Sequence, residues 1–516
     1  MSRFTKFSYT LISGYVMMGA NVAFTLASVP LALHHLSKAE FGLWALTTQI
    51  AGYVALIDLG MAGALTRILV DYKDDVASAN YGSLILTGFL VSLAQGCLIL
   101  GGGVGLAWLL APLLDLPAEV WREFRWLVIW QCVVLATAFA FRIAGHLLAA
   151  HQRSYIVNFS QAISFLVNYG VLWFGFARGW GVFSMVWAQL AAQVIPAAAA
   201  IVACVALRLF PAAGRWGAPT WRSFCELFAF GRDMFFYSLG GQLVNASQLI
   251  LITRLLGLDT AAVWSVCTRA LTLLNQLVYR IFDYACLPLA EMMVRGEAER
   301  LLSRFKSIVV LSASLAVLAG VMFAACNQPF VRWWTGRDLG WTPINDWLLA
   351  FWFVLTVLVR IYTGLAGLTK EFRFLRYVYF LEGLFFVGVS WLVLRPGGVT
   401  AMIGVSIAGS LLFSLQYGIR RVSEYFQTDW KAVALEWIRP SLRLALLVLP
   451  MGATLAWLSR PLSSFWGFAV VSAIIGAVGG FFLFRWGLDE AMRAELRLRV
   501  SSKIAWLRNW LGQPRG

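Results

Sequence analysis

Apolar runs of about 20 residues recur from one end of this 516-residue chain to the other. A helix rises about 1.5 Å per residue, so each run is long enough to cross a hydrocarbon core of about 30 Å. Only 13% of the residues are charged and 60% are hydrophobic, whereas soluble globular domains are about a quarter charged. We therefore predict an all-α polytopic membrane protein.

The apolar runs predict about fourteen transmembrane helices. Both termini then lie on one side of the membrane. If that side is the cytoplasm, about 29 of the 41 lysines and arginines fall on the cytoplasmic side and about 9 outside, as the positive-inside rule requires. The expected spans are 9–33, 42–66, 84–110, 126–149, 155–177, 181–207, 233–253, 261–287, 307–328, 344–368, 377–395, 398–419, 442–459 and 465–486.

The spans group into two six-helix lobes followed by two further helices. A Pro-, Gly- and Arg-rich stretch separates the sixth span from the seventh, and a shift of about 220 residues aligns Trp44 with Trp264 and Thr48 with Thr268. Parallel six-helix repeats are a transporter architecture with the binding site between the halves. We expect an N-terminal lobe at 1–207, a cytoplasmic linker at 208–232, a C-terminal lobe at 233–419, a cytoplasmic joint at 420–441, spans thirteen and fourteen at 442–486, and an amphipathic cytoplasmic tail at 487–516.

Charge, cysteine and histidine content exclude several other classes. The net charge of +16 fits cytoplasmic loops and anionic lipid head groups rather than nucleic acid. The seven cysteines lie scattered in or beside apolar runs without a CxxC pair, and the histidines have no Cys or Glu at metal-binding spacing. We therefore expect reduced cysteines, no metal site and no cofactor.

Polar residues form a stripe along one face of several predicted spans. Residues spaced by three or four lie on one face of a helix, while Leu, Val and Ile cover the other faces. The eighth span carries Thr268, Thr272, Asn275, Tyr279 and Asp283 at this spacing, flanked by Arg269, Gln276 and Arg280. The seventh span has Gln242 and Asn245, and the first has Asn21. We expect spans one, two, seven and eight to face a wet interior.

Arginines lie within several predicted spans, among them Arg269, Arg280 and Arg360. An isolated charge at mid-bilayer costs on the order of 3 kcal/mol, so each requires an acidic partner or water. Arg280 can pair with Asp283 three residues on, and Asp58 with an arginine of a neighbouring helix. We expect Arg269 and Arg360 to face a cavity instead. Because a guanidinium donates two hydrogen bonds at once, the preferred guest is an anion such as phosphate.

The longest predicted external loop, 332–343, holds Trp333, Trp334 and Trp341. These side chains suit an interfacial aromatic belt, which is the interpretation we favour, or they can stack on sugar rings.

Residues 29–67, VPLALHHLSKAEFGLWALTTQIAGYVALIDLGMAGALTR, resemble the start of prokaryotic polysaccharide flippases of the multidrug/oligosaccharidyl-lipid/polysaccharide (MOP) exporter superfamily. The residues that carry the resemblance are Gly42, Asp58, Gly60 and Arg67. The number of spans, the joint between two six-helix lobes and the pair of trailing spans extend the resemblance over the whole chain.

The resemblance implies a V-shaped, MATE-like fold of two lobes that alternates between inward-open and outward-open forms. It also implies a substrate in which an oligosaccharide is joined through diphosphate to a polyprenyl lipid such as undecaprenyl diphosphate. The protein would move this lipid to the outer leaflet of a bacterial inner membrane for O-antigen (lipopolysaccharide), capsule or exopolysaccharide synthesis. We expect a monomer, with a glycan polymerase or glycosyltransferase as candidate partners.

The resemblance also suggests site residues. Related lipid flippases use arginines on the first, second and eighth spans; here Arg67 and Arg269 correspond, whereas the first span has Asn21 and no central arginine. The expected substrate-binding set is Arg269, Arg360, Arg67, Arg142, Arg280, Asn21, Asn245, Gln242 and Asn275. The acids within spans that can couple transport to protons or sodium, or simply neutralise arginines, are Asp58, Asp283 and Glu382.

Two other functions compete with the flippase. A multidrug exporter of the same superfamily is the first, but such pumps favour organic cations, and a cavity with several arginines repels them. A membrane glycan polymerase or ligase is the second, but such enzymes need catalytic groups in a sizeable external loop, and no predicted external loop here is long. We therefore expect a transporter and not an enzyme.

Overall fold

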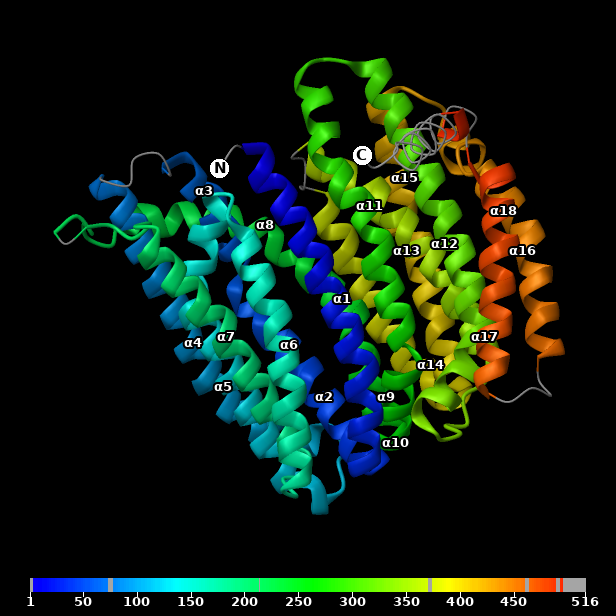
Figure 1. Cartoon of the computed structure of the whole chain (residues 1–516), viewed down its shortest axis with the longest axis horizontal. Coiled ribbons are helices and arrows are strands. Elements are labelled where there is room, and N and C mark those ends of the chain that lie inside the picture. The colour runs from blue at the N-terminus through cyan, green and yellow to red at the C-terminus, as the bar shows by residue number, and fades with distance from the viewer. Residues whose placement is uncertain are drawn as a thin grey trace, which may run out of the picture. The chain divides into compact units, whose positions relative to one another are not determined.

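The computed structural model describes residues 3–72, 78–212, 214–369, 374–459, 464–488 and 492–494. In these ranges the secondary structure is helical, with short turns and without strands (Figure 1). The prediction of an all-α membrane protein is therefore confirmed. The chain divides into two compact units: unit 1 is Met1–Val266, Trp334–Gly336 and Phe372–Met402, and unit 2 is Cys267–Trp333, Arg337–Glu371 and Ile403–Gly516.

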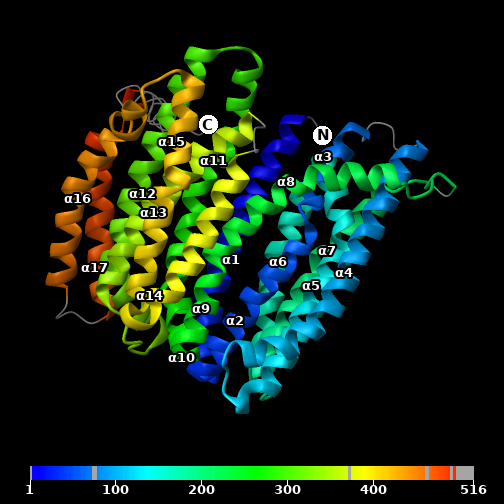
Figure 2. The same ribbon diagram turned by 180° about the vertical axis from the view of Figure 1, so that it is seen from behind.

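Unit 1 is built around a bundle of long helices, in which α4 packs on α5, α6 on α7 and α1 on α6 (Figure 1, Figure 2). Its elements are α1 (Arg3–His35), α2 (Lys38–Val54), η1 (Ala55–Asp58), α3 (Met61–Tyr72), α4 (Ala79–Leu113), η2 (Ala118–Val120), α5 (Trp121–Ala150), α6 (Ser154–Ala177), α7 (Phe183–Ala206), α8 (Trp221–Asn245), α9 (Ser247–Leu256) and α10 (Leu258–Cys267), whose last residue opens unit 2.

The core of unit 1 lies where α3, α4, α5 and α7 meet. Leu69, Tyr81, Leu147 and Cys204 are fully buried there. The Tyr81 hydroxyl donates to the Leu209 carbonyl oxygen at 2.9 Å, so its polar end is satisfied inside the cluster. The motif residue Gly42 has a separate packing role, because a Cβ at this position would collide with the backbone carbonyl of Leu258. A residue without a side chain thus lets α2 approach α10 closely.

Unit 2 is a second set of packed helices, in which α13 contacts both α11 and α15. Val317 and Val321 of α12 form a buried cluster with Leu444 and Val448 of α16. The elements are α11 (Arg269–Val294), α12 (Ala298–Thr335), α13 (Pro343–Leu368), α15 (Ser414–Phe426), η3 (Ala432–Glu436), α16 (Arg439–Leu458), α17 (Ser464–Ile474), η4 (Ile475–Gly479), α18 (Gly480–Phe482) and η5 (Leu483–Gly487). Helix α14 (Leu375–Leu412) begins in unit 1 and ends in unit 2.

The helices agree with the predicted spans once two bends and one junction between helices are taken into account. By length and apolarity, the described residues contain 11 helices able to cross a membrane, or 12 if the bent pair Lys38–Asp58 and Met61–Val70 counts as one span. The stretch Leu375–Phe426 counts as one helix, but Gly398 has φ 62° and ψ −163°, which separates the predicted spans 377–395 and 398–419. Helices α10 and α11 meet at Thr268, and the charged residues of α11 make the predicted eighth span less apolar than the others.

Other predictions stay predictions. The amphipathic tail at 487–516 lies almost entirely outside the described residues. The lobe boundaries, the cytoplasmic position of the termini and the orientation of the spans are likewise expectations from the sequence.

Candidate functional site

The second predicted span bends at Asp58, the last residue of η1. Leu59 and Gly60 follow with φ 50° and 72°, left-handed values that end the helix. The axes on the two sides of this break differ by 46°. The Asp58 carboxylate accepts from the backbone N–H of Ala62 at 3.3 Å, so it also caps the first turn of α3. The motif residues Asp58 and Gly60 therefore define a broken helix.

Arg142 of α5 binds the side chain at this break. Its Nη1 donates to Asp58 Oδ1 at 2.5 Å, its Nη2 to Gln95 Oε1 at 2.5 Å, and its Nε to Ser92 Oγ at 3.0 Å. Its guanidinium carbon also lies 4.3 Å from the centre of the Phe139 ring. Three separate nitrogens of one guanidinium are thus engaged by α4 and the bend, which holds the charge in a defined orientation.

Gln95 connects the arginine to the backbone of the bend. Its Nε2 donates to the carbonyl oxygens of Ile57 and Asp58, at 2.9 and 3.2 Å. A break in a helix leaves backbone carbonyls without their usual hydrogen-bond donors. Here a side chain from the neighbouring helix provides the donors. Sequence analysis missed Gln95, although a glutamine inside the otherwise apolar run 84–110 was a visible signal.

Arg142 lies on the wall of an open cavity of about 390 Å³ between α5, α6 and α7. His146, Ser154, Asn158, Gln161 and Gln193 also line it, and its lining contains no acidic residue. His146 Nδ1 lies 2.8 Å from Thr66 Oγ1 of α3, so the cavity wall is tied to the helix after the bend. The cavity therefore combines one cation with neutral hydrogen-bonding groups.

A second arginine–aspartate pair occurs in unit 2. Arg360 Nη2 of α13 donates to Asp283 Oδ1 of α11 at 2.9 Å, and the two side chains are 40% and 35% exposed. The Tyr279 ring lies one turn before Asp283, and its centre is 5.9 Å from the guanidinium carbon. Asp283 thus bonds Arg360 and not Arg280, the partner that its i,i+3 spacing had allowed.

The two pairs occupy corresponding positions in the chain. Asp283 follows Asp58 by 225 residues and Arg360 follows Arg142 by 218 residues, both close to the shift of about 220 residues that aligns the predicted halves. The acids belong to predicted spans two and eight, and the arginines to predicted spans four and ten. Each unit therefore contains an ion pair between an arginine and an aspartate of two different predicted spans.

The structure places the other predicted arginines on more open surfaces. Arg269 is the first residue of α11 and is exposed, as is Arg67 on α3. Arg280 is partly exposed and forms no ion pair within the described residues. In α11, Asn275 Oδ1 is buried without a hydrogen-bond partner among the described residues.

The remaining predicted residues are placed as follows. Gln242 Nε2 donates to the Gly52 carbonyl at 3.4 Å, and Asn245 Nδ2 donates to the Gly241 carbonyl at 2.9 Å, so both amides engage backbone groups. Asn21 is partly exposed on α1, and Glu382 is buried on α14 within unit 1.

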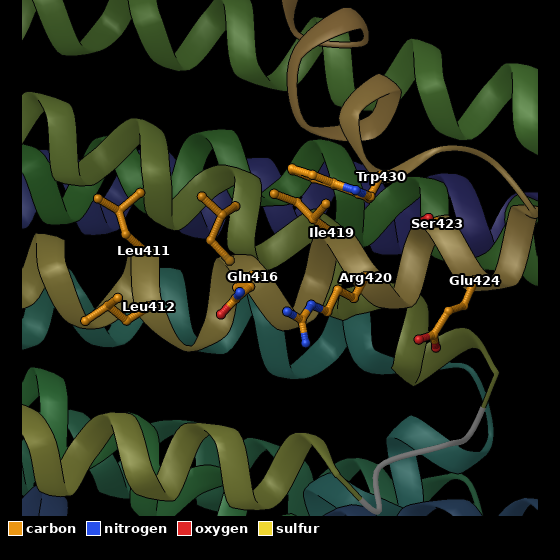
Figure 3. Close-up of a pocket in the computed structure, with 9 residues that line it drawn as sticks. Leu411, Leu412, Gln416, Ile419, Arg420, Ser423, Glu424 and Trp430 are labelled. Atoms are coloured by element: carbon orange, nitrogen blue, oxygen red, sulfur yellow. The ribbon is translucent and has the colours of Figure 1, made fainter.

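A groove of about 670 Å³, which sequence analysis did not predict, follows α15 in unit 2 (Figure 3). One end is apolar, with Leu411, Leu412, Leu415 and Ile419. Towards the other end the lining becomes polar and charged, with Gln416, Arg420, Ser423 and Glu424, and Trp430 completes it. The groove is therefore amphipathic along its length.

Comparison with known proteins identifies the family. A family model described as polysaccharide biosynthesis protein matches residues 7–294, which is more than half of the chain. No curated protein matches the sequence significantly.

Several solved structures share the fold. The lipid II flippase MurJ, in an inward closed conformation, has a TM-score of 0.63 at 11% identity, and the match covers 93% of this chain and 99% of that one. An inward-facing multidrug resistance MATE family transporter of the MOP superfamily has a TM-score of 0.57 at 14% identity, covering 83% and 97%. A MOP superfamily transporter from Pyrococcus furiosus has a TM-score of 0.53 at 15% identity, covering 83% and 96%.

The family and these folds agree with the expectation of a transporter rather than an enzyme. The chain belongs to the polysaccharide biosynthesis protein family and has the fold of the MOP superfamily of flippases and exporters.

Proposed function

We propose that this protein is a flippase that moves a polyprenyl-diphosphate-linked oligosaccharide from the cytoplasmic to the outer leaflet of a bacterial inner membrane. The observation that carries the proposal is the pair of intramembrane arginines, Arg142 on Asp58 and Arg360 on Asp283. A charge is retained within a span only where it is paired or functional. A diphosphate is an anion, and each guanidinium group can bind it through two parallel hydrogen bonds.

The cavity beside Arg142 supports a sugar-bearing anion as the guest. Asn158, Gln161 and Gln193 offer both donors and acceptors to hydroxyl groups, whereas Arg142 supplies the charge for a phosphate. No acidic residue lines this cavity, so an organic cation would find no carboxylate on its wall to bind. This favours the flippase over the multidrug exporter as a function.

The aspartates give each arginine a reversible counterion. When the substrate is absent, Asp58 and Asp283 neutralise Arg142 and Arg360, so the empty protein does not hold a bare charge in the membrane. A bound diphosphate takes over these hydrogen bonds, and each released carboxylate can then take up a proton or sodium ion. Alternating access between the two lobes would move the diphosphate across, with Arg67 and Arg269 adding charge along its path.

The groove along α15 supports an amphiphilic substrate. An isoprenoid chain would contact Leu411, Leu412 and Leu415, while Arg420 lies at the polar end where an anionic group would be found (Figure 3). In the orientation that we propose, both termini are cytoplasmic, and so is this polar end.

A transport assay tests the proposal directly. Purified full-length protein is reconstituted into liposomes with a fluorescent polyprenyl-diphosphate oligosaccharide, and a membrane-impermeant quencher reports which leaflet holds it. We expect translocation of this lipid and none of a cationic dye. Translocation of the dye with the lipid left in place would instead identify a multidrug exporter.

A further inference from the structure

A fully buried carboxylate lies at the start of α13, outside the arginine pairs. Asp346 is 0% exposed, although its neighbour Pro343 opens the helix at the end of the 332–343 loop. Its Oδ1 accepts from Asn327 Nδ2 at 2.7 Å and from Trp341 Nε1 at 2.8 Å. The carboxylate is thus fixed by α12 on one side and by the loop on the other.

Asn327 links this carboxylate to the junction between α10 and α11. Its side chain is 2% exposed, and its Nδ2 also donates to the Cys267 carbonyl at 3.0 Å. Cys267 is the last residue of α10, and Arg269 is the first residue of α11. The hydrogen bonds of one amide therefore join Asp346 to the junction just before Arg269.

Two oxygens in this cluster have no donor. Asp346 Oδ2 and Asn327 Oδ1 are both buried, and neither has a hydrogen-bond partner among the residues that the structure describes. Two unsatisfied acceptors side by side in an apolar region are unfavourable, and more so when one belongs to an ionised carboxylate. A single proton on Asp346 Oδ2 removes the charge and converts that acceptor into a donor.

Asp346 differs in its partners from two of the acids predicted from the sequence. Asp58 and Asp283 each contact a guanidinium group. Asp346 has no ion pair within the described ranges. Cys267 and the ion pair between Arg332 and Asp338 line the small cavity beside Asn327 and Trp341. The atoms of this ion pair lie 3.0 Å apart, and its side chains are largely exposed.

A small cavity lies beside the two residues that hydrogen-bond the buried acid. It has a volume of about 10 Å³, which is about the space of one water molecule, and Asn327, Trp341, Arg332 and Asp338 line it. Trp341, whose role was left open between an aromatic belt and sugar stacking, here forms the wall between Asp346 and the loop.

We propose that Asp346, positioned by Asn327 and Trp341, is a proton-binding site of this transporter. Its carboxylate takes one proton from water on the side of the 332–343 loop and returns it as an ordinary acid, without any redox step. Protonation weakens Oδ1 as an acceptor for Asn327, and this changes the restraint on the Cys267 carbonyl at the helix junction before Arg269.

The binding site itself is tested without any transport substrate. Infrared difference spectra of the purified full-length protein are recorded as the pH is lowered, and the C=O stretch of a protonated carboxylic acid is followed. We expect the wild type to show a band that is lost in Asp346→Asn and retained in Asp338→Asn, an exposed acid on the same loop. A band that persists unchanged in Asp346→Asn overturns the proposal.

Trp341→Phe provides a variant that keeps the acid. Removal of the indole N–H takes away a hydrogen bond that favours the carboxylate, so the band should appear at a pH about one unit higher than in the wild type. If the pH midpoint of the band is the same in Trp341→Phe and in the wild type, the hydrogen bond from Trp341 to Asp346 is contradicted. The titration is repeated with choline in place of sodium, and suppression of the band by sodium at constant pH would overturn a proton site in favour of a sodium site.

The role in transport rests on the proposed function and is measured separately. In liposomes, a pH gradient should accelerate translocation of the labelled lipid by the wild type but not by Asp346→Asn. If the band depends on Asp346 but no lipid moves, the proposed function fails and the proton site stands. If lipid moves and the gradient acts equally on Asp346→Asn, the coupling role fails and the flippase stands.

Discussion

Arg142 donates from Nη1 to Asp58 Oδ1 at 2.5 Å, although the two residues are 84 positions apart in the chain. The bond forms because the second span bends at Asp58, and α5 packs against both sides of this bend. The same chemistry recurs at Arg360 and Asp283, which are 77 positions apart. In each unit, therefore, an aspartate neutralises the charge of an arginine from another helix.

The first prediction concerns the pair in unit 1. Arg142→Gln leaves the Asp58 carboxylate without its cation, at a cost on the order of 2 kcal/mol, and should lower the midpoint of thermal unfolding in detergent. The double variant Asp58→Asn/Arg142→Gln should recover most of this loss, because neither charge remains. If the double variant is as destabilised as the sum of the single ones, the two side chains do not interact in the protein.

Gln95 offers a second test of the bend. Gln95→Leu removes the partners of the Ile57 and Asp58 carbonyls and of Arg142, and should destabilise the protein by about 1–3 kcal/mol. Gln131 on α5 is the matched control, because it is equally buried but its Nε2 has no partner among the described residues. Gln131→Leu should be neutral or stabilising in the same thermal unfolding experiment. Equal losses in both variants would exclude a specific role for Gln95.

Gly42 should be intolerant of any side chain. The Cβ of Gly42→Ala would collide with the backbone carbonyl of Leu258, so α2 and α10 must separate and the yield of folded protein should fall. Gly63 on α3 has open space around it, and Gly63→Ala should stabilise the helix by up to about 1 kcal/mol. Size-exclusion profiles and unfolding midpoints of the two variants show whether the loss is specific to the close helix approach at Gly42 or follows from any glycine-to-alanine substitution.

The sequence predicts the helices well because apolar length and polar spacing are local properties. The pairing of charges is not local. The spacing of Arg280 and Asp283 allowed an ion pair on one helix, yet Asp283 bonds Arg360 because α13 packs against α11 at that level. For Asp58, the alternative of an arginine on a neighbouring helix was open, but the sequence could not select Arg142.

Two further residues show the limits of reasoning from spacing alone. Gln95 and Ser92 are the polar side chains on this face of a mostly apolar helix, too few to mark a stripe, and the broken helix opposite explains the presence of Gln95. Asp346 lies at a predicted span end, where a carboxylate ordinarily reaches water. Only the packing of Asn327 and Trp341 around it reveals a buried acid.

The proposed orientation can be checked with native cysteines. Cys225 is exposed in α8 and belongs to the predicted cytoplasmic linker 208–232. Cys97 is also exposed but lies inside the span 84–110, where lipid shields it from charged reagents. A membrane-impermeant thiol reagent should therefore label Cys225 in inside-out vesicles and not in right-side-out ones, with Cys225→Ser as the control. Labelling of Cys225 from the outer face would invert the topology.

The central claim is that arginines of the predicted spans bind the diphosphate of the lipid. Its most direct measurement is the rate at which labelled polyprenyl-diphosphate oligosaccharide crosses liposomes that contain Arg269→Ala, with Arg300→Ala, a surface arginine of α12, as the matched control. We predict a rate about 10- to 100-fold below that of the wild type for Arg269→Ala, from the loss of charge-assisted hydrogen bonds, and an unchanged rate for Arg300→Ala. Translocation by correctly inserted Arg269→Ala at the wild-type rate would contradict the account.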